Sequence, residues 1–310
     1  QEKKEAKLKE KLEAKKQSLS NEQLDKLIKD TEELQKWQST PNSKEELAKL
    51  PTLTRGDIDN KIKEYKTIKE AKDGITMLKH PVFTNGLNYV SLYFDTSKIP
   101  QDKLGYLSLL ETIFGKVDTK NYTKEQLQNY IMINSGGIKI RSNIFQDAKN
   151  NDKYYPKEHA TILCLNNKMD KNFQLLNEII FNSKLNDKER LKEIISSTKM
   201  NLENQFMNNG FRFANEKILS YISEAGKYNN YQSEGFYKFL CELDKNFSSK
   251  SDEVIKNLEN VRDMVFNKQD MIVSYTGEEK YYKNFINSFN GFSKNLKNND
   301  LKVQQDRKSV

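Results

Sequence analysis

Cysteine and histidine are scarce in this sequence of 310 residues, which contains two of each. Cys164 and Cys241 stand far apart within apolar runs. This placement is typical of buried thiols and argues against a disulfide framework or a CxxC metal knuckle. His80 and His159 have no second His or Cys at ligand spacing, so we expect each to be a surface or strand-edge residue. The chain thus supplies no two-histidine zinc motif of its own.

Long apolar runs are also missing. No stretch approaches the roughly 18 apolar residues of a membrane-spanning helix, and the segment from Gln1 to Glu5 lacks the apolar core of a secretory signal. The mean hydropathy is −0.87, yet 16 Phe and 15 Tyr exceed what a disordered chain carries. We therefore expect a folded chain of about two domains with no membrane partner. Because it opens without Met inside a charged helical pattern, we expect it to be part of a longer protein.

Neither sign of charge dominates the sequence. A net charge of +8 results from 52 basic and 44 acidic residues, and lysines alternate with glutamates at spacings of three and four along residues 3–16. A surface that follows a phosphate backbone would concentrate its basic residues instead. We expect a solvated, lysine-rich surface and no nucleic-acid partner. Two isolated cysteines without a visible targeting signal favour a cytoplasmic location, with an organelle as the alternative.

Residues 1–61 are predicted to form a helical hairpin connector followed by a linker. Ser20 with Gln23 and Ser43 with Glu46 each match a capping box, which places a helix start after each serine. Leucines at helical spacing support the first two helices, and a proline ends the third. The rest of this segment combines polar caps with turn residues and indicates an extended linker.

Residues 62–294 alternate between strand and helix patterns and predict an α+β domain, an antiparallel sheet covered by helices. Strands are expected at 75–78 and 88–94, as an antiparallel pair around an Asn85-Gly86 turn, and at 138–145, 160–165 and 271–275. Helices are expected at 102–114, 123–133, 173–181, 187–207, 213–222, 235–243, 252–266 and 278–289. Residues 295–310 are expected to form a tail or a linker to a next domain.

The remaining motifs indicate no independent activity. A GxSxG nucleophile elbow is absent, although a Ser/His/Asp or Cys/His constellation of distant residues stays open. Gly136-Gly137 follows a predicted helix and precedes a strand, the reverse of a phosphate-binding loop. An aromatic cluster could stack on nucleobases, but its mixed helical spacing favours core and rim positions. Its members are Phe206, Phe211, Phe213, Tyr221, Tyr228 and Tyr231.

Six stretches, taken in order, match one known family. They are LSNEQ at 19–23, WQSTPNSKEEL at 37–47, LPTLTRGDI at 50–58, TNGLNYV at 84–90, INSGGI at 133–138 and NDKERL at 186–191. In combination they make residues 1 to about 290 resemble the insulinase-like, or pitrilysin-type, zinc metallopeptidases. The presequence-protease and falcilysin branch is the nearest group.

The resemblance implies a place within a larger enzyme. In this family four similar α+β domains form two halves that are joined by a helical hairpin and close around unfolded peptides. The first domain carries zinc on an HxxEH helix. The resemblance identifies this chain as the connector plus the third domain, which belongs to the non-catalytic half.

The helix that corresponds to the zinc-binding helix is residues 103–112. Ser108 and Thr112 stand where the family has its two zinc-binding histidines, so only Glu111 remains of the pattern. Neutral hydroxyls are poor zinc ligands. The resemblance therefore implies no catalytic and no metal-binding residue in this chain, leaves substrate-binding residues unassigned, and assigns zinc to the full-length parent.

The function implied is that of a non-catalytic segment of a zinc-dependent oligopeptidase. It would form the hinge and chamber wall of a two-half clamshell and would be inactive alone. Its partners would be the catalytic N-terminal half of the same peptidase and short unstructured peptides. The alternative is a stand-alone inactive homologue that acts as a peptide-binding or assembly protein.

Overall fold

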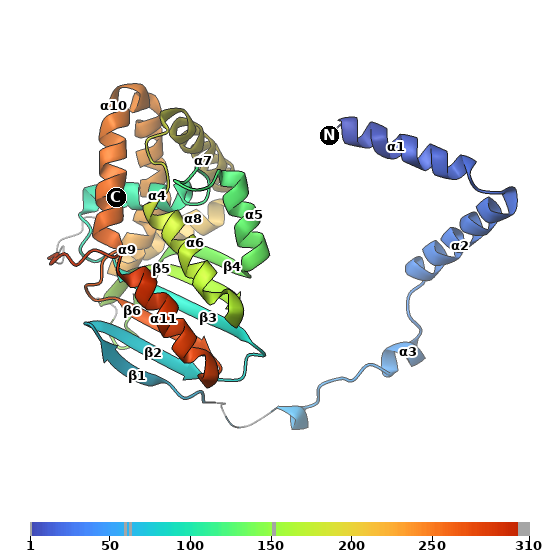
Figure 1. Ribbon diagram of the computed structural model, residues 1–310, viewed down its shortest axis with the longest axis horizontal. Coiled ribbons are helices and arrows are strands. Elements are labelled where there is room, and N and C mark those ends of the chain that lie inside the picture. The colour runs from blue at the N-terminus through green and yellow to red at the C-terminus, as the bar shows by residue number, and fades with distance from the viewer. Residues whose placement is uncertain (1, 59–60, 62–63, 151–152, 303–310) are drawn as a thin grey trace. The chain divides into compact units, whose positions relative to one another are not determined.

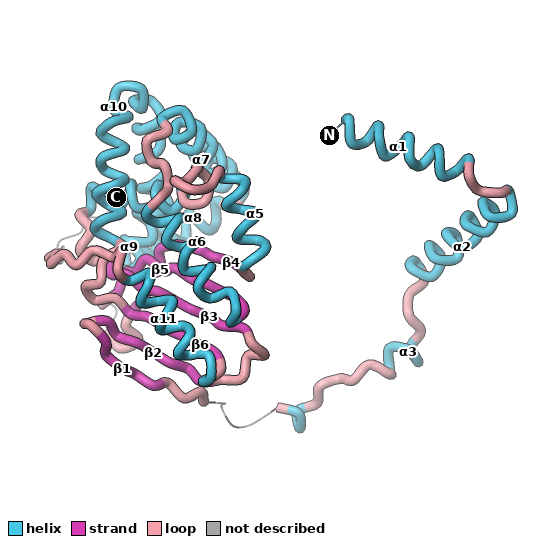
Figure 2. The backbone as a smooth tube through the Cα atoms, viewed as in Figure 1, coloured by secondary structure: helices cyan, strands magenta, loops and turns pink. Residues whose placement is uncertain are grey.

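The computed structural model describes residues 2–58, 61, 64–150 and 153–302. The chain divides into two compact units, Gln1–Lys63 and Glu64–Val310. Figure 1 labels their elements, and Figure 2 colours the backbone by secondary structure.

The first unit is helical. It contains α1 (Glu2–Gln17), α2 (Asn21–Ser39), α3 (Lys44–Ala48) and the 3₁₀ turn η1 (Arg55–Asp57). Both predicted capping boxes are confirmed, with the Ser20 and Ser43 hydroxyls accepting from the backbone N–H groups of Gln23 and Glu46. Leu24 is half-buried, but the other large apolar side chains of these helices are exposed, among them Leu8, Leu12, Leu27, Ile28, Leu34 and Trp37.

The second unit contains a six-stranded sheet in the order β1-β2-β6-β3-β5-β4. The strands are β1 (Ile68–Lys72), β2 (Ile75–Pro81), β3 (Leu87–Asp95), β4 (Gly137–Gln146), β5 (Tyr154–Leu165) and β6 (Ile272–Gly277). All neighbouring strands are antiparallel except β2 and β6, which are parallel. The α+β class is thus confirmed.

The predicted direct pairing of the strands around Asn85-Gly86 is wrong. β6 lies between β2 and β3 and hydrogen-bonds to both. Asn85 and Gly86 do adopt positive φ, at 53° and 80°, but they serve a loop between strands that are not neighbours. A true two-residue hairpin turn lies at Asp73-Gly74, with φ of 51° and 78°, and joins β2 to the unpredicted strand β1.

Helices cover one face of the sheet. This face is formed by apolar residues at every second position of the strands. Val90, Leu92 and Phe94 of β3 and Ile162 of β5 are buried on this face. The helices α4 (Leu104–Ile113), α5 (Lys124–Asn134), α6 (Met169–Phe181), α9 (Glu224–Asn230) and α11 (Tyr282–Ser293) contact strands. Figure 1 shows α6 and α11 side by side across the sheet.

The other helices form a further layer. They are α7 (Lys188–Asn208), α8 (Gly210–Ile222) and α10 (Phe236–Val265), and the π-helical turn η4 (Tyr231–Gly235) leads into α10. In this layer α7 and α10 contact α4, and α8 contacts α7 and α9. The prediction of separate helices at 235–243 and 252–266 is wrong, because α10 runs through both. Phe247, Ser251 and Val254 are buried and continue the packed stripe across the serine-rich segment.

The packed part of the second unit continues past residue 294. Leu296 is buried, and Lys297 forms a parallel bridge with Asn267. Asn267 Nδ2 also donates to the carbonyl oxygen of Asn299 at 3.0 Å. Residues 295–301 therefore belong to the fold rather than to a tail, whereas residues 303–310 lie outside the described part of the chain.

Candidate functional site

α4 is the helix that the resemblance aligns with the zinc helix of the metallopeptidases, and its polar residues do not fit a metal ion. Ser108 is buried, and the Thr112 hydroxyl donates to the Ser108 carbonyl oxygen at 2.8 Å. This hydrogen bond directs the hydroxyl to the backbone of its own helix. Within the described ranges no group of three or more His, Cys, Asp or Glu residues could hold a metal ion.

Glu111, the remaining motif residue, belongs to a buried carboxyl pair. Ser142 Oγ on β4 lies 2.6 Å from Glu111 Oε1 and 2.9 Å from Glu158 Oε2 on β5. A hydroxyl has a single proton and can donate to only one of the two oxygens. The other contact requires a proton on a carboxyl group, so the cluster holds at least one shared proton.

The electrostatics of the pair agree with this proton count. Burial and the nearby Glu111 raise the pKa of Glu158 well above its usual range, and burial raises the pKa of Glu111. Glu158 is fully buried, and its Oε1 atom has no hydrogen-bond partner among the described residues. The pair therefore joins α4 to the sheet through a neutral or half-neutral contact.

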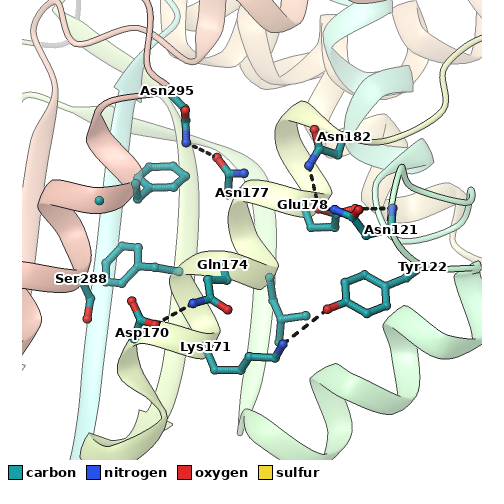
Figure 3. Close-up of a pocket in the computed structure, with 14 residues that line it drawn as sticks. Asn121, Tyr122, Asp170, Lys171, Gln174, Asn177, Glu178, Asn182, Ser288 and Asn295 are labelled. Carbon is teal, nitrogen blue, oxygen red and sulfur yellow. Dashed lines mark hydrogen bonds between the residues drawn. The ribbon is translucent and has the colours of Figure 1, made fainter.

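A polar groove of about 500 Å³ lies between α6, α11 and the loop that precedes α5 (Figure 3). Glu178 at its base is 4% exposed. It accepts from the backbone N–H and Nδ2 of Asn121, both at 2.9 Å, and from Asn182 Nδ2 at 2.7 Å. Burial acts to raise the pKa of Glu178, but the hydrogen bonds from Asn182, Thr119 and Asn121 outweigh it and hold the pKa low.

Other side chains of the groove pair with one another. Asn295 Nδ2 donates to Asn177 Oδ1 at 2.7 Å, which links the end of α11 to α6. Lys171 Nζ donates to the Tyr122 hydroxyl oxygen at 3.4 Å. Nowhere in this groove, all of whose lining residues the structure describes, is a nucleophile hydrogen-bonded to a base. The hydrogen bonds between its lining side chains thus hold α6, α11 and the 118–123 loop together.

The sheet face opposite the core presents paired polar and aromatic side chains. The register aligns Arg141, His159 and Tyr93 in one row across β4, β5 and β3. The His159 ring stacks on Tyr93 at a centroid distance of 4.3 Å. Lys157 Nζ pairs with Asp95 Oδ1 at 2.8 Å in the next row. We call this surface the open sheet face.

Aromatic side chains project from the open sheet face into solvent. Tyr89, Phe145 and Tyr155 are each between 45% and 48% exposed. Such a surface of rings and paired charges suits an extended polypeptide, whose backbone and apolar side chains it can both contact.

Of the two histidines, only His159 departs from the expected strand-edge position, whereas His80 lies near the end of β2. His159 is in the middle of β5 with a strand on each side, because that strand begins at Tyr154 rather than near His159. Burial and the nearby Arg141 lower its pKa. His80 Nδ1 lies 3.1 Å from Thr67 Oγ1 near the end of β2.

Both cysteines are free thiols, Cys164 buried and Cys241 half-buried. Burial raises the pKa of Cys164 to about 12, so this thiol is unreactive. No helix in the described part of the chain is long and apolar enough to span a bilayer.

The fold defines an α+β domain that follows a helical unit at the N-terminus. Residues 1–243 match a protein family described as peptidase-associated, of metallopeptidase family 16, subfamily C. The chain belongs to this family, which confirms the insulinase-like resemblance and a peptidase-associated, non-catalytic role.

Relatives in two kingdoms agree with this assignment. The chain is 35% identical over 305 residues to "Protein HypA" of Clostridium perfringens, a match that covers 98% of this chain and 31% of the relative. It is 26% identical to "Presequence protease 1, chloroplastic/mitochondrial" of Arabidopsis thaliana, over 88% of this chain and 25% of that protein. The chain therefore spans less than a third of each of these relatives.

The fold is also similar to a solved structure, a conserved protein from Enterococcus faecalis V583. The TM-score is 0.54 with 12% sequence identity, over 79% of this chain and 57% of the other. At this identity the similarity concerns the fold alone.

Proposed function

We propose that this chain forms the hinge and part of the chamber wall of a zinc-dependent oligopeptidase whose metal site is on another segment. The observation that carries the proposal is α4. Where the family's zinc helix has histidines, α4 has a buried Ser108 and a Thr112 hydroxyl bonded to its own backbone. A helix kept in the fold without metal ligands fits a domain that supports catalysis from a distance.

The open sheet face would supply the chamber wall. Its exposed Tyr89, Phe145 and Tyr155 rings would contact unfolded peptides, and closure around the peptide would exclude water from the scissile bond. The partners would be this peptide and the catalytic N-terminal half of the same peptidase. Zinc would be bound by the full-length parent protein and not by the residues of this chain.

The first unit would act as the connector between the halves. Its helices are capped and charged, and they present exposed apolar side chains such as Leu27 and Trp37, which a partner could cover. The two free thiols fit a reducing compartment, and we propose the cytoplasm.

Hydrolysis of a quenched fluorogenic oligopeptide tests this function. The assay compares the chain alone, the HxxEH-bearing half alone and their mixture, each with Zn²⁺ and with a chelator. We expect chelator-sensitive activity that the mixture shows well above either part. Activity of the chain alone would contradict the assignment of α4, and an inactive mixture would favour the stand-alone binding or assembly protein.

A further inference from the structure

The open sheet face carries more positive than negative charge. The alternation of the strands assigns four basic side chains and one acidic side chain to its outward positions. The acidic one, Asp95, forms an ion pair with Lys157. The basic side chains that remain without an ion pair among the described residues are Lys69, Lys139 and Arg141. The face therefore favours an anionic ligand.

Arg141 is the cation of this face that is best placed to bind a ligand. It is exposed in the middle of β4, which with β1 forms the edges of the sheet (Figure 2). Lys139 projects from the same face two residues earlier, about 7 Å along the strand. In the described part of the chain the Arg141 side chain forms no ion pair and no hydrogen bond.

The carboxyl group that Arg141 influences is on the other side of the sheet. Burial raises the pKa of Glu111 on α4, and the charge of Arg141 opposes this rise. Glu111 lies on the side that the helices cover, where its hydrogen-bond partner is Ser142. The guanidinium is thus available to a ligand on the solvent side.

Aromatic side chains next to Arg141 are held in place by one another. His159, directly opposite Arg141 on β5, stacks on Tyr93, and its Nδ1 atom lies 2.8 Å from Asn143 Nδ2. Phe145 packs edge-on against Tyr93 at a centroid distance of 5.8 Å. Burial and the nearby Arg141 lower the pKa of His159, so this ring is neutral at pH 7 and adds an aromatic surface rather than a charge.

Apolar side chains lie on both sides of Arg141 along the strands. Phe145 and Tyr155 face each other across β4 and β5 at one end, each nearly half exposed. Tyr89 and Leu165 lie toward the other end and are 46% and 51% exposed. A ligand that uses the whole face therefore continues in both directions from Arg141. An Asp or Glu residue inside a peptide meets this requirement, whereas a C-terminal carboxylate would leave one end uncovered.

We propose that the open sheet face binds an extended peptide through an internal Asp or Glu residue, whose carboxylate Arg141 holds in a bidentate contact. The apolar neighbours of that residue would cover the exposed rings. A single-stranded nucleic acid also combines anions with rings, but it carries a charge at every nucleotide, and the three unpaired cations of this face are spread from β1 to β4. The inference rests on the proposed chamber wall and adds which peptides this wall selects.

Nuclear magnetic resonance of the two histidine rings tests the proposal on the full chain. His159 reports on the surroundings of Arg141, and His80 is the internal reference, because three strands separate β2 from β4. Three peptides share one apolar sequence: a central Glu with blocked ends, a central Gln with blocked ends, and a central Gln with a free C-terminus. We expect the Glu peptide to shift the His159 signal and to bind about fivefold more tightly than either Gln peptide.

Substitutions of the basic residues identify the binding partner. Arg141→Gln should lower the affinity for the Glu peptide to that for the Gln peptides. Arg141→Lys should keep only part of the preference, because an ammonium group cannot form the bidentate contact. Lys69→Gln is the matched control and should change neither affinity, since it removes the same charge from the opposite edge of the same face. Both positions are exposed, so these changes spare the core.

Several results would overturn the proposal. They are equal affinity for the Glu and blocked Gln peptides, absence of binding, a preference that survives Arg141→Gln, and tightest binding by the free C-terminus or by an oligothymidylate. The assay needs no catalytic half, so its outcome is separate from the hydrolysis test. A chain without a Glu preference whose mixture hydrolyses peptides would refute this inference alone. A Glu preference beside an inactive mixture would refute the peptidase proposal and fit the stand-alone binding protein.

Discussion

The carboxyl pair of Glu111 and Glu158 is the residue-scale feature with the clearest thermodynamic consequence. Buried carboxyl groups whose pKa is raised bind protons in the folded state that they release when the chain unfolds. Their contribution to stability is fully present below the unfolded pKa of about 4.3 and is lost as pH rises through the raised folded pKa.

We therefore predict that Glu158→Gln flattens the pH dependence of stability above the unfolded carboxyl pKa. Glutamine preserves the shape and the contact with Ser142 but cannot ionise. Urea unfolding at about pH 5 and about pH 9 measures the difference between the two proteins. An identical pH slope in both would contradict the shared proton, and Glu259→Gln provides the exposed control.

Glu178 gives the opposite case, a buried carboxylate that is stabilised as an anion. We predict that Glu178→Gln destabilises the chain by about 1.5–3 kcal/mol, because an amide NH₂ would face the Asn121 and Asn182 donors. Since the pKa of Glu178 is lowered, its contribution is present above the unfolded pKa and is lost as pH falls through the folded pKa.

Chemical denaturation at neutral pH measures the Glu178 effect. Gln174, exposed one turn earlier on α6, supplies the control, and Gln174→Ala should change stability by less than about 0.5 kcal/mol. A Glu178→Gln variant as stable as the parent would mean that the groove does not need the anion.

Sequence reasoning reached some of these residues and missed others. It identified Glu111 through the family pattern, but Glu158 joins it through the pairing of β4 with β5, which sets Ser142 opposite Glu158, and through the packing of α4 on β4. No local signal encodes either contact. Glu178 stands within the apolar run LLNEII, and this position was a usable sign of burial. One donor to Glu178, Asn182, is four residues away, but the other, Asn121, comes from a loop 57 residues away, a distance that patterning does not span.

At the scale of elements, the close contact between α8 and α9 depends on a single glycine, Gly226. A Cβ atom on Gly226 would lie 2.1 Å from the carbonyl oxygen of Leu219, a backbone atom that cannot turn aside. We predict that Gly226→Ala costs about 1–3 kcal/mol by forcing the two helices apart. Thermal unfolding measures the loss.

Gly210 at the start of α8 is the matched control for Gly226. Nothing lies within 4 Å of a Cβ built there, so Gly210→Ala should leave stability unchanged or raise it by up to about 1 kcal/mol. Equal losses from both alanines would show that glycine is needed for backbone freedom rather than for helix contact.

Element boundaries that depend on local chemistry were predictable. The capping boxes predicted at Ser20 and Ser43 both appear, and the helices expected at 123–133 and 187–207 begin behind the caps Thr123 and Asp187. Each of these caps is a contact within four residues. Strand β1 was missed, since its sequence IKEAK lacks the alternation of a half-buried strand. Only its Asp73-Gly74 turn indicated a hairpin.

At the scale of the whole molecule, the apolar core is confined to one of the two units. Every member of the main buried cluster lies between Ile75 and Leu296. We predict that a chain of residues 64–310 unfolds with the same thermal midpoint as the full chain, because that core takes all its residues from the second unit. Differential scanning calorimetry of the two chains measures this, and a midpoint lowered by several degrees would contradict it.

The place of β6 determines when the protein can fold during synthesis. The strand that occupies the middle of the sheet, residues 272–277, is the last strand of this sheet to be made, and β2 and β3 each pair with it. A ribosome that adds about 5–20 residues per second must therefore synthesise nearly 200 residues, from the start of β2 to the start of β6, before β2 and β3 can pair with β6. During this interval β2 and β3 have unpaired edges that other nascent chains could join. A chaperone that shields strand edges should therefore raise the yield of this protein more than that of a domain whose neighbouring strands follow one another in sequence.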